Sequence, residues 1–301
     1  MRTNIMINKR LSSLTKALPI AASLLLLSGC IVHISTSGSN VQQQQQLSLS
    51  AAQLQQLAID AESGSLQIIG SSTATEITVD ATIYTAKIDD AYTLTLEQVG
   101  NKAVLIAKDY NPTGMVVYQG NSPSIDLVVT VPSAFNLDID DDSGDINIAS
   151  VQGNIEIDDD SGSITINQGH NVTIDDDSGD LDLQNITGNI EISDDSGSIN
   201  IRDVRGNLVI EDDSGDITLT NITGSVDIDD NSGSINAKTL GNYITIEDES
   251  GDIYVEHVNG LVTIEDGSGS IRVNDSKGLT IIEAGSGDLS IDNINGPVKL
   301  N

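Results

Sequence analysis

The sequence predicts an all-β protein, a parallel β-solenoid (β-helix) of about 18 residues per coil with an antiparallel β insertion capping its N-terminal end. The main observation is a Ser-Gly dipeptide that recurs at intervals of eighteen residues, with a single interval of seventeen. A fixed period near twenty is typical of solenoids. Aromatic residues make up only 2% of the chain, so the core must consist of Ile, Leu and Val, which favour strands.

Each coil is predicted to contain two short strands and two bends. Apolar residues lie seven and five positions before each turn Gly, and two, four and seven positions after it. Alternate residues of a strand share one face, so stacked coils should align these residues in interior columns, one from Ile155 to Val262 and another from Ile164 to Ile253. Right-handed winding is expected, because parallel crossovers are overwhelmingly right-handed. The turn glycines, which accept positive φ at low cost, are Gly144, Gly162, Gly179, Gly197, Gly215, Gly233, Gly251, Gly269 and Gly287.

The start of the chain has the layout of a bacterial lipoprotein signal peptide, predicted over residues 1–29. Residues 1–16 carry four basic residues and no acid, and an apolar stretch from Ala17 to Leu27 follows. This stretch is too short to span a membrane. It ends in Leu27-Ser28-Gly29-Cys30, which resembles a lipobox, so Cys30 is the predicted lipidation site, acylated with chains such as palmitate.

The remaining chain is predicted to form three segments. Residues 30–50 are interpreted as a lipidated flexible tether, because Ser, Gly, Asn and the Gln42–Gln46 run bury little apolar area. Residues 51–135 are predicted to form an N-terminal β region that caps the solenoid, since an open sheet edge invites aggregation. Residues 136–301 are the solenoid repeats. Ile31, after Cys30, resembles the outer-membrane sorting pattern of Gram-negative lipoproteins, so we expect a lipid-anchored envelope protein.

The charge of the chain restricts its partners. The formal net charge is -32, from 45 acidic and 13 basic residues, and such a field repels phosphate backbones. We therefore expect no nucleic acid partner. Cations, another surface protein or a glycan with basic regions are the partners that the field would concentrate, and membrane attachment is expected only through the lipid on Cys30.

A run of acidic residues precedes each turn Gly and is the candidate metal site. Stacked runs would form carboxylate ladders that attract counterions, and Ca²⁺ prefers six to eight oxygen ligands. The alternative is a solvated acidic face without specific binding; no cofactor other than calcium is considered. The candidate metal ligands are Asp158, Asp159, Asp160, Asp175, Asp176, Asp177, Asp194, Asp195, Asp212 and Asp213.

The residue after each turn Gly alternates strictly between Asp and Ser, beginning with Asp145 and Ser163. This makes the unit thirty-six residues long. The interleaved Ser would separate the carboxylates and offer them hydroxyl neighbours, which relieves repulsion. Duplication history with electrostatic relief is the preferred interpretation, and a periodic binding surface is the alternative.

The repeat resembles the bacterial “putative adhesin” β-strand-repeat family, a domain family of unknown function. The resemblance rests on the Ser143-Gly144-Asp145 type of turn and on the segment Leu127-Val128-Val129-Thr130-Val131-Pro132, and it extends over residues 50–301. It implies a β-solenoid and a surface or adhesive role, and brings no catalytic residues. The leading hypothesis is thus a non-enzymatic envelope lipoprotein that presents an acidic rod for adhesion or scaffolding. The alternatives are a calcium-binding surface module and a polysaccharide-acting β-helix enzyme.

Overall fold

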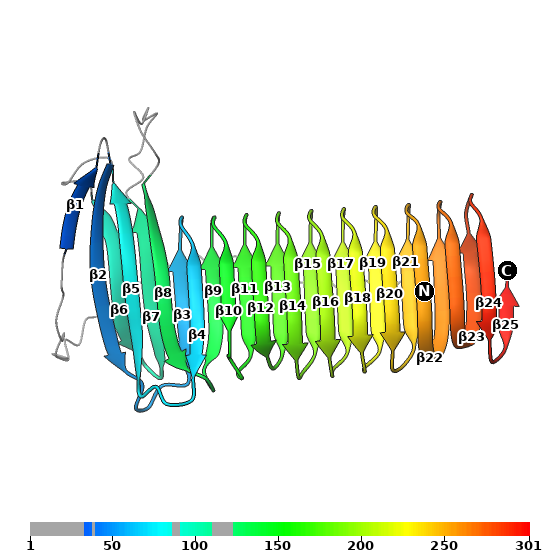
Figure 1. Cartoon of the computed structure of the whole chain (residues 1–301), viewed down its shortest axis with the longest axis horizontal. Coiled ribbons are helices and arrows are strands. Elements are labelled where there is room, and N and C mark those ends of the chain that lie inside the picture. Colours follow the sequence, from blue (N-terminus) through cyan, green and yellow to red (C-terminus); the bar gives the residue numbers. More distant parts are fainter. Residues whose placement is uncertain (1–32, 38–39, 86–90, 110–122) are drawn as a thin grey trace.

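The molecule is an all-β rod in the residues that the computed structural model describes, which are 33–37, 40–85, 91–109 and 123–301. The strands form two sheets, and within each sheet they follow one another along the long axis of the rod. The chain passes from one sheet to the other at every bend (Figure 1). This confirms the predicted parallel β-solenoid with antiparallel N-terminal strands. No helix of these residues is long and apolar enough to cross a membrane.

Sheet A is the sheet that precedes the Ser-Gly turns. Its strands within the coils are parallel and in register, so equivalent residues of neighbouring coils lie side by side. In spatial order sheet A contains β6 (Tyr92–Val99), β7 (Lys102–Asp109), β3 (Gln56–Ala61), β9 (Asn136–Asp141), β11 (Ile155–Asp159), β13 (Val172–Asp176), β15 (Ile190–Asp194), β17 (Leu208–Asp212), β19 (Val226–Asp230), β21 (Ile244–Asp248), the second halves of β22 (Ile253–Asp266) and β23 (Ile271–Ala284), and β25 (Val298–Leu300).

Sheet B is the sheet that follows the Ser-Gly turns, and its coil strands are also parallel and in register. In spatial order it contains β1 (His33–Ser37), β2 (Asn40–Ser50), β5 (Glu76–Thr85), β8 (Ser124–Pro132), β4 (Leu66–Ser71), β10 (Ile146–Ala149), β12 (Ile164–Gly169), β14 (Leu181–Ile186), β16 (Ile199–Val204), β18 (Ile217–Ile222), β20 (Ile235–Leu240), the first halves of β22 and β23, and β24 (Leu289–Ile294).

The core consists of aliphatic columns between the two sheets, as the spacing predicts. The first column pairs Ile155 with Val172 and continues in register to Val262. The second runs from Ile164 to Ile253 on sheet B. Their side chains are almost completely buried. Strand alternation therefore places the aliphatic residues inside and the residues between them outside.

The N-terminal strands cover one end of the solenoid. The first coil is β3 and β4, which pair in parallel with β9 and β10 of the second coil. The chain between them forms β5 to β8, which join the outer edges of this first coil: β7 pairs with β3, β8 pairs with β4, and β5 and β6 add antiparallel strands outside them. Residues 51–135 thus contain one coil interrupted by an insertion.

The tether prediction is wrong for residues 40–50, which form β2 rather than a flexible segment. β2 pairs with β5 in antiparallel register from Val41↔Thr85 to Ser50↔Glu76. Val41 and Leu47 face the interior, and Gln43 between them is buried as well. The sequence does not show this alternation, because polar Gln occupies both the inward and the outward positions of the strand.

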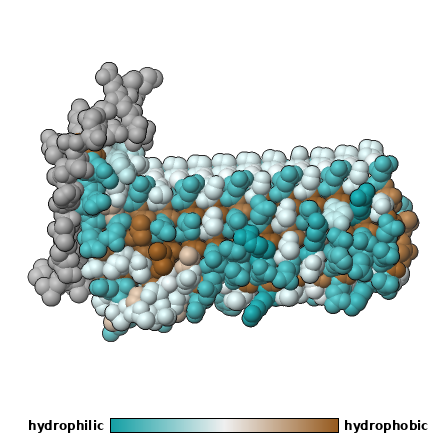
Figure 2. Space-filling view, in the orientation of Figure 1, coloured by the Kyte–Doolittle hydropathy of each residue, from teal (hydrophilic) through white to brown (hydrophobic). Residues whose placement is uncertain are grey.

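The Ser-Gly turns need glycine for two reasons. Gly197 has φ +145°, where an L side chain is strained. A Cβ on it would also collide with the carbonyl oxygen of Gly179 in the preceding coil. Each turn stacks directly on the next, and Figure 2 shows these turns as a pale row along the upper edge of the rod.

The second bend uses positive φ at residues other than glycine. Asn185, Asp203 and Asn221 have φ near +60°, and each lies three residues before the Gly that the sequence marked as the corner. Gly206 at that corner instead provides space, because a Cβ there would collide with the backbone of Gly188. Asn and Asp tolerate this left-handed conformation better than most residues.

Candidate functional site

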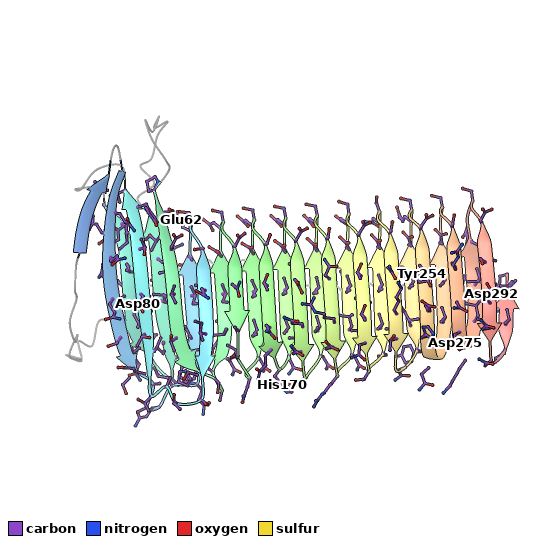
Figure 3. The ribbon with its side chains drawn as sticks, viewed as in Figure 1. Glu62, Asp80, His170, Tyr254, Asp275 and Asp292 are labelled. Atoms are coloured by element: carbon purple, nitrogen blue, oxygen red, sulfur yellow. The ribbon has the colours of Figure 1, made fainter. Side chains whose placement is uncertain are left out.

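The acidic runs divide between the interior and the surface. In the run Asp158-Asp159-Asp160, the outer two side chains are exposed and Asp159 is 1% exposed. The strand alternation that buries Ile155 and Ile157 continues through Asp159, so the middle acid points inward. Figure 3 shows side chains repeating from coil to coil along the Ser-Gly edge, where Glu62 is labelled, opposite the edge with His170 and Asp275.

One inward-facing Asp per coil forms what we call the interior carboxyl row. Neighbouring members are register partners in sheet A. At one end the row meets Ala61 of the first coil, and at the other end it meets Ala284. Its eight members, all at most 5% exposed, are Asp141, Asp159, Asp176, Asp194, Asp212, Asp230, Asp248 and Asp266.

The candidates Asp159, Asp176, Asp194 and Asp212 are buried, so they are not part of the solvated acidic face that is the alternative to a metal site. The exposed candidates are Asp158, Asp160, Asp175, Asp177, Asp195 and Asp213. The signal that could have separated the two groups is the position three before the turn Gly, which has the same parity as the buried positions seven and five before it.

Six of the eight carboxylates of the row use one oxygen to brace the Ser-Gly turn, whereas neither oxygen of Asp141 or Asp266 has a hydrogen-bond partner. Oδ1 of Asp194 accepts the backbone N–H of Ser196 at 3.1 Å, and Oδ1 of Asp230 accepts that of Ser232 at 2.9 Å. The same bond occurs in the coils of Asp159, Asp176, Asp212 and Asp248. The second oxygen, Oδ2, is buried without a hydrogen-bond partner in all eight members.

Burial raises the pKa of every carboxyl group in the row. It raises the pKa of Asp159 to about 8, with further contributions from the charges of Asp141 and Asp176. The pKa of Asp212 rises to about 7 for the same two reasons, loss of hydration and neighbouring carboxylates. In Asp194 the hydrogen bond from Ser196 opposes the effect of burial, and the pKa rises only to about 6. Desolvation disfavours the charged form, which explains the common direction.

The outer surface of sheet A carries two columns of carboxylates, which we call the outer acidic columns. They lie six and four positions before each turn Gly, and the parallel register aligns Glu156 with Asp138 and Asp229 with Glu211. Like charges aligned at strand spacing repel one another and attract counterions. The columns contain Asp138, Glu156, Glu191 and Asp227, and Asp140, Asp158, Asp175, Glu211, Asp229, Glu247 and Glu265.

The outer surface of sheet B has a different character. Its outward positions are mostly Asn, Thr and Gln, and it carries the basic residues Arg202, Lys238 and Arg272. Arg202 binds Oδ1 of Asp182 at 2.8 Å and Oε1 of Gln184 at 3.0 Å on the preceding coil. The Tyr254 hydroxyl donates to Glu256 at 2.7 Å, and Lys238 Nζ lies 5.0 Å from its ring centre. The rod is thus acidic on one face and near neutral on the other.

The Asp/Ser alternation links neighbouring coils. Oδ1 of Asp180 accepts the backbone N–H of Ser198 in the next coil at 3.0 Å. The coils of Asp145, Asp216 and Asp252 repeat this bond. The sequence predicts that the Ser hydroxyls relieve the carboxylates, whereas the backbone N–H is the group that does so.

The described residues give no structural support for a metal site and do not include the predicted lipidation site. Among the described residues, no group of three or more His, Cys, Asp or Glu side chains is arranged to hold a metal ion. Calcium binding therefore remains a prediction. Cys30 and residues 1–29 lie outside the described part of the chain, so the lipidation site also remains a prediction.

These features define a two-sheet, acidic β-solenoid repeat protein. The chain belongs to the Toastrack DUF4097 family, whose profile matches residues 107–260. This confirms the family resemblance predicted from the repeat. No curated protein matches the chain.

Three solved structures are similar to parts of this chain at low sequence identity. A “putative adhesin” from Bacteroides fragilis is 15% identical over 86% of this chain and 97% of its own, with a TM-score of 0.30. A “putative adhesin” from Parabacteroides merdae is 12% identical over 86% and 96%, with a TM-score of 0.31. A “putative cell adhesion protein” from Clostridium sporogenes is 10% identical over 86% and 98%, with a TM-score of 0.26.

Proposed function

We propose that this protein is a non-enzymatic lipoprotein of the cell envelope that presents its acidic rod for adhesion or scaffolding. The outer acidic columns carry the proposal, because they give one long face of a rigid rod a single charge at regular spacing. Such a face concentrates basic partners and repels anionic ones. The leader and Cys30 would attach the rod to the outer membrane of a Gram-negative cell.

The repetition of the carboxylates argues against catalysis. Glycoside hydrolysis uses one pair of carboxylates with different roles, whereas here nearly identical acids recur in every coil of sheet A. Arg202, a candidate for holding an anionic sugar, is instead paired with Asp182 on sheet B. Repeated carboxylates can bind an extended partner at many points, whereas a single reaction centre needs only one pair.

The test of the acidic face compares two variants of the full chain that remove the same charge. One carries Glu211→Gln, Asp229→Asn and Glu247→Gln in the outer acidic columns, and the other carries Asp160→Asn, Asp177→Asn and Asp195→Asn at the turn edge. Attachment of cells displaying each variant to a polylysine-coated surface is measured. We expect roughly tenfold weaker attachment for the first variant and little change for the second. Equal losses would show that net charge alone acts, and no loss would refute the proposed face.

The anchor is tested separately by Cys30→Ser. We expect this variant to leave the membrane fraction and to lose the acyl chains detected by labelling with radioactive palmitate. The variant lacks the thiol that a lipobox requires, so retention of both lipid and membrane association would contradict the lipoprotein assignment. Because the substitution does not alter the rod, a failure here leaves the adhesive face to be judged by the attachment assay.

A further inference from the structure

The interior carboxyl row holds at least one oxygen atom per member that is buried away from water and has no hydrogen-bond partner. In six members Oδ1 accepts a Ser N–H, whereas Oδ2 of every member is buried and has no donor. An ionised carboxylate in this position would lack both hydration and compensation, which costs several kcal/mol. The row therefore requires a cation.

No basic side chain supplies that cation among the described residues. The ion pairs there involve Lys102, Lys108, Arg202 and His257, and none of them reaches the row. The charged groups that act on the row are acids from every side. They are its own members in adjacent coils, the flanking acids of the same runs, and Asp180, Asp216 and Asp252 at the starts of the strands that follow the turns.

A metal ion does not fit the row either. Ca²⁺ takes six to eight oxygen ligands and Mg²⁺ six, but a member of the row offers one unoccupied oxygen, or two at Asp141 and Asp266. The described residues contain no group arranged as a metal site. A proton needs neither a coordination shell nor a cavity, since it binds covalently to one oxygen.

We propose that the interior carboxyl row is a proton-binding site, and that the folded rod keeps protons on carboxylic acids along its core at mildly acidic to neutral pH. Protonation removes the uncompensated charge from Oδ2 and converts that oxygen into a hydroxyl donor. The neighbouring carboxyl of the next coil, its register partner in sheet A, is the acceptor within the row. The raised pKa values of the row agree with this assignment.

The ends of the row support the same interpretation. The column continues as Ala61 in the first coil and as Ala284 toward the last, so no carboxyl occupies this position where the row would reach the capping strands or the exposed end coil. The protonated groups are thereby confined to the coils whose neighbours cover them on both sides.

Infrared spectroscopy of the full chain at pH 7 tests the proposal directly, because the C=O stretch of a protonated carboxyl is resolved from the carboxylate bands. We expect this band in the folded protein and expect it to disappear on unfolding in denaturant at the same pH, since an unfolded Asp is ionised there. Absence of the band from the folded protein, at any sodium or calcium concentration, would overturn the proposal.

Matched variants assign the band to the row. Asp194→Asn with Asp212→Asn removes two of the eight carboxyls while keeping Oδ1 as an acceptor. At pH 5.5, below the pKa of both groups, the band should therefore lose about a quarter of the intensity that the row contributes. Asp195→Asn with Asp213→Asn, at the adjacent exposed positions, should leave it unchanged. A band that responds to the exposed pair rather than the interior pair would refute the assignment. If the interior variant does not fold, the folded and unfolded spectra of the unaltered chain still decide.

Discussion

At the scale of single residues, the second bend is the most strained part of each coil. One residue per coil adopts φ between +55° and +85° so that the following side chain can turn back into the core. This column includes Asn185, Asp203 and Asn221, which accept the conformation, but also Thr239, whose branched Cβ does not. The bend requires a positive φ in these coils, and at several of these positions the sequence has Asn or Asp, which tolerate it.

Thr239→Gly should therefore stabilise the protein. Thr239 has φ +60° and is exposed, so its replacement by glycine should relieve backbone strain of about 1 to 2 kcal/mol. Glycine also has more conformational entropy in the unfolded chain, which offsets roughly half of that gain. We expect a net gain of about 0.5 to 1 kcal/mol in the free energy of unfolding measured in urea. Thr220→Gly, at an exposed strand position of the preceding coil, should lose about the same amount. Destabilisation by both substitutions would show that the bend is not strained.

At the scale of the coil, side-chain ladders supplement the backbone pairing. Oδ1 of Asn189 accepts the backbone N–H of Asn207 at 3.0 Å, and Oδ1 of Asn171 accepts the backbone N–H of Asn189 at 2.9 Å. The Asp and Ser residues after the turn Gly form a second set of such links. The Asn ladder thus joins successive coils from Asn136 to Ser225, and the Asp–Ser links join alternate pairs of coils.

Removing one link of the Asn ladder tests its contribution. Asn189→Ala deprives the Asn207 N–H of its acceptor, and the free energy of unfolding should fall by about 1 kcal/mol. Asn200→Ala, on the outer surface of sheet B in the same coil, is the control and should change it by less than about 0.5 kcal/mol. Chemical denaturation monitored by circular dichroism measures both. A ladder without energetic value would give two equal, small effects.

The coil could be predicted from the sequence because its aliphatic columns and turn glycines repeat at one period. Ile190 and Ile199 lie in the predicted interior columns. The interior position of Asp194 is not predicted, because acidic residues are ordinarily exposed although this one has the parity of the buried positions. The strand at Val41 is not predicted, because its Gln-rich sequence shows little alternation of polar and apolar residues. Burial of a carboxyl depends on how neighbouring coils stack, and that information is not local in the sequence.

At the scale of the whole molecule, the rod combines an acidic surface with an acidic core. Screening by salt acts on the outer acidic columns, which are in contact with solvent. It acts little on the interior carboxyl row, which is buried between two sheets. The two sets of acids should therefore respond differently to salt and pH, and this difference allows them to be separated in one experiment.

The rod should be more stable at mildly acidic than at alkaline pH. An Asp in the unfolded chain loses its proton near its ordinary pKa of about 3.8, whereas members of the row keep theirs up to a pKa of about 6 to 8. Between these values the folded protein binds more protons than the unfolded protein, so the free energy of unfolding falls as pH rises. At about 1.4 kcal/mol per pKa unit, we expect a total decrease on the order of 3 to 5 kcal/mol between pH 5 and pH 8, less than the sum over eight coupled groups.

Urea unfolding at several pH values and two salt concentrations measures this dependence. High salt should raise stability at every pH by screening the outer acidic columns, but it should preserve the downward slope with pH, because the row is shielded from ions. Asp194→Asn with Asp212→Asn should flatten the slope, and Asp195→Asn with Asp213→Asn should not. If stability instead rose with pH, as in proteins whose carboxylates are paired in the folded state, the row would have to be ionised in the native rod.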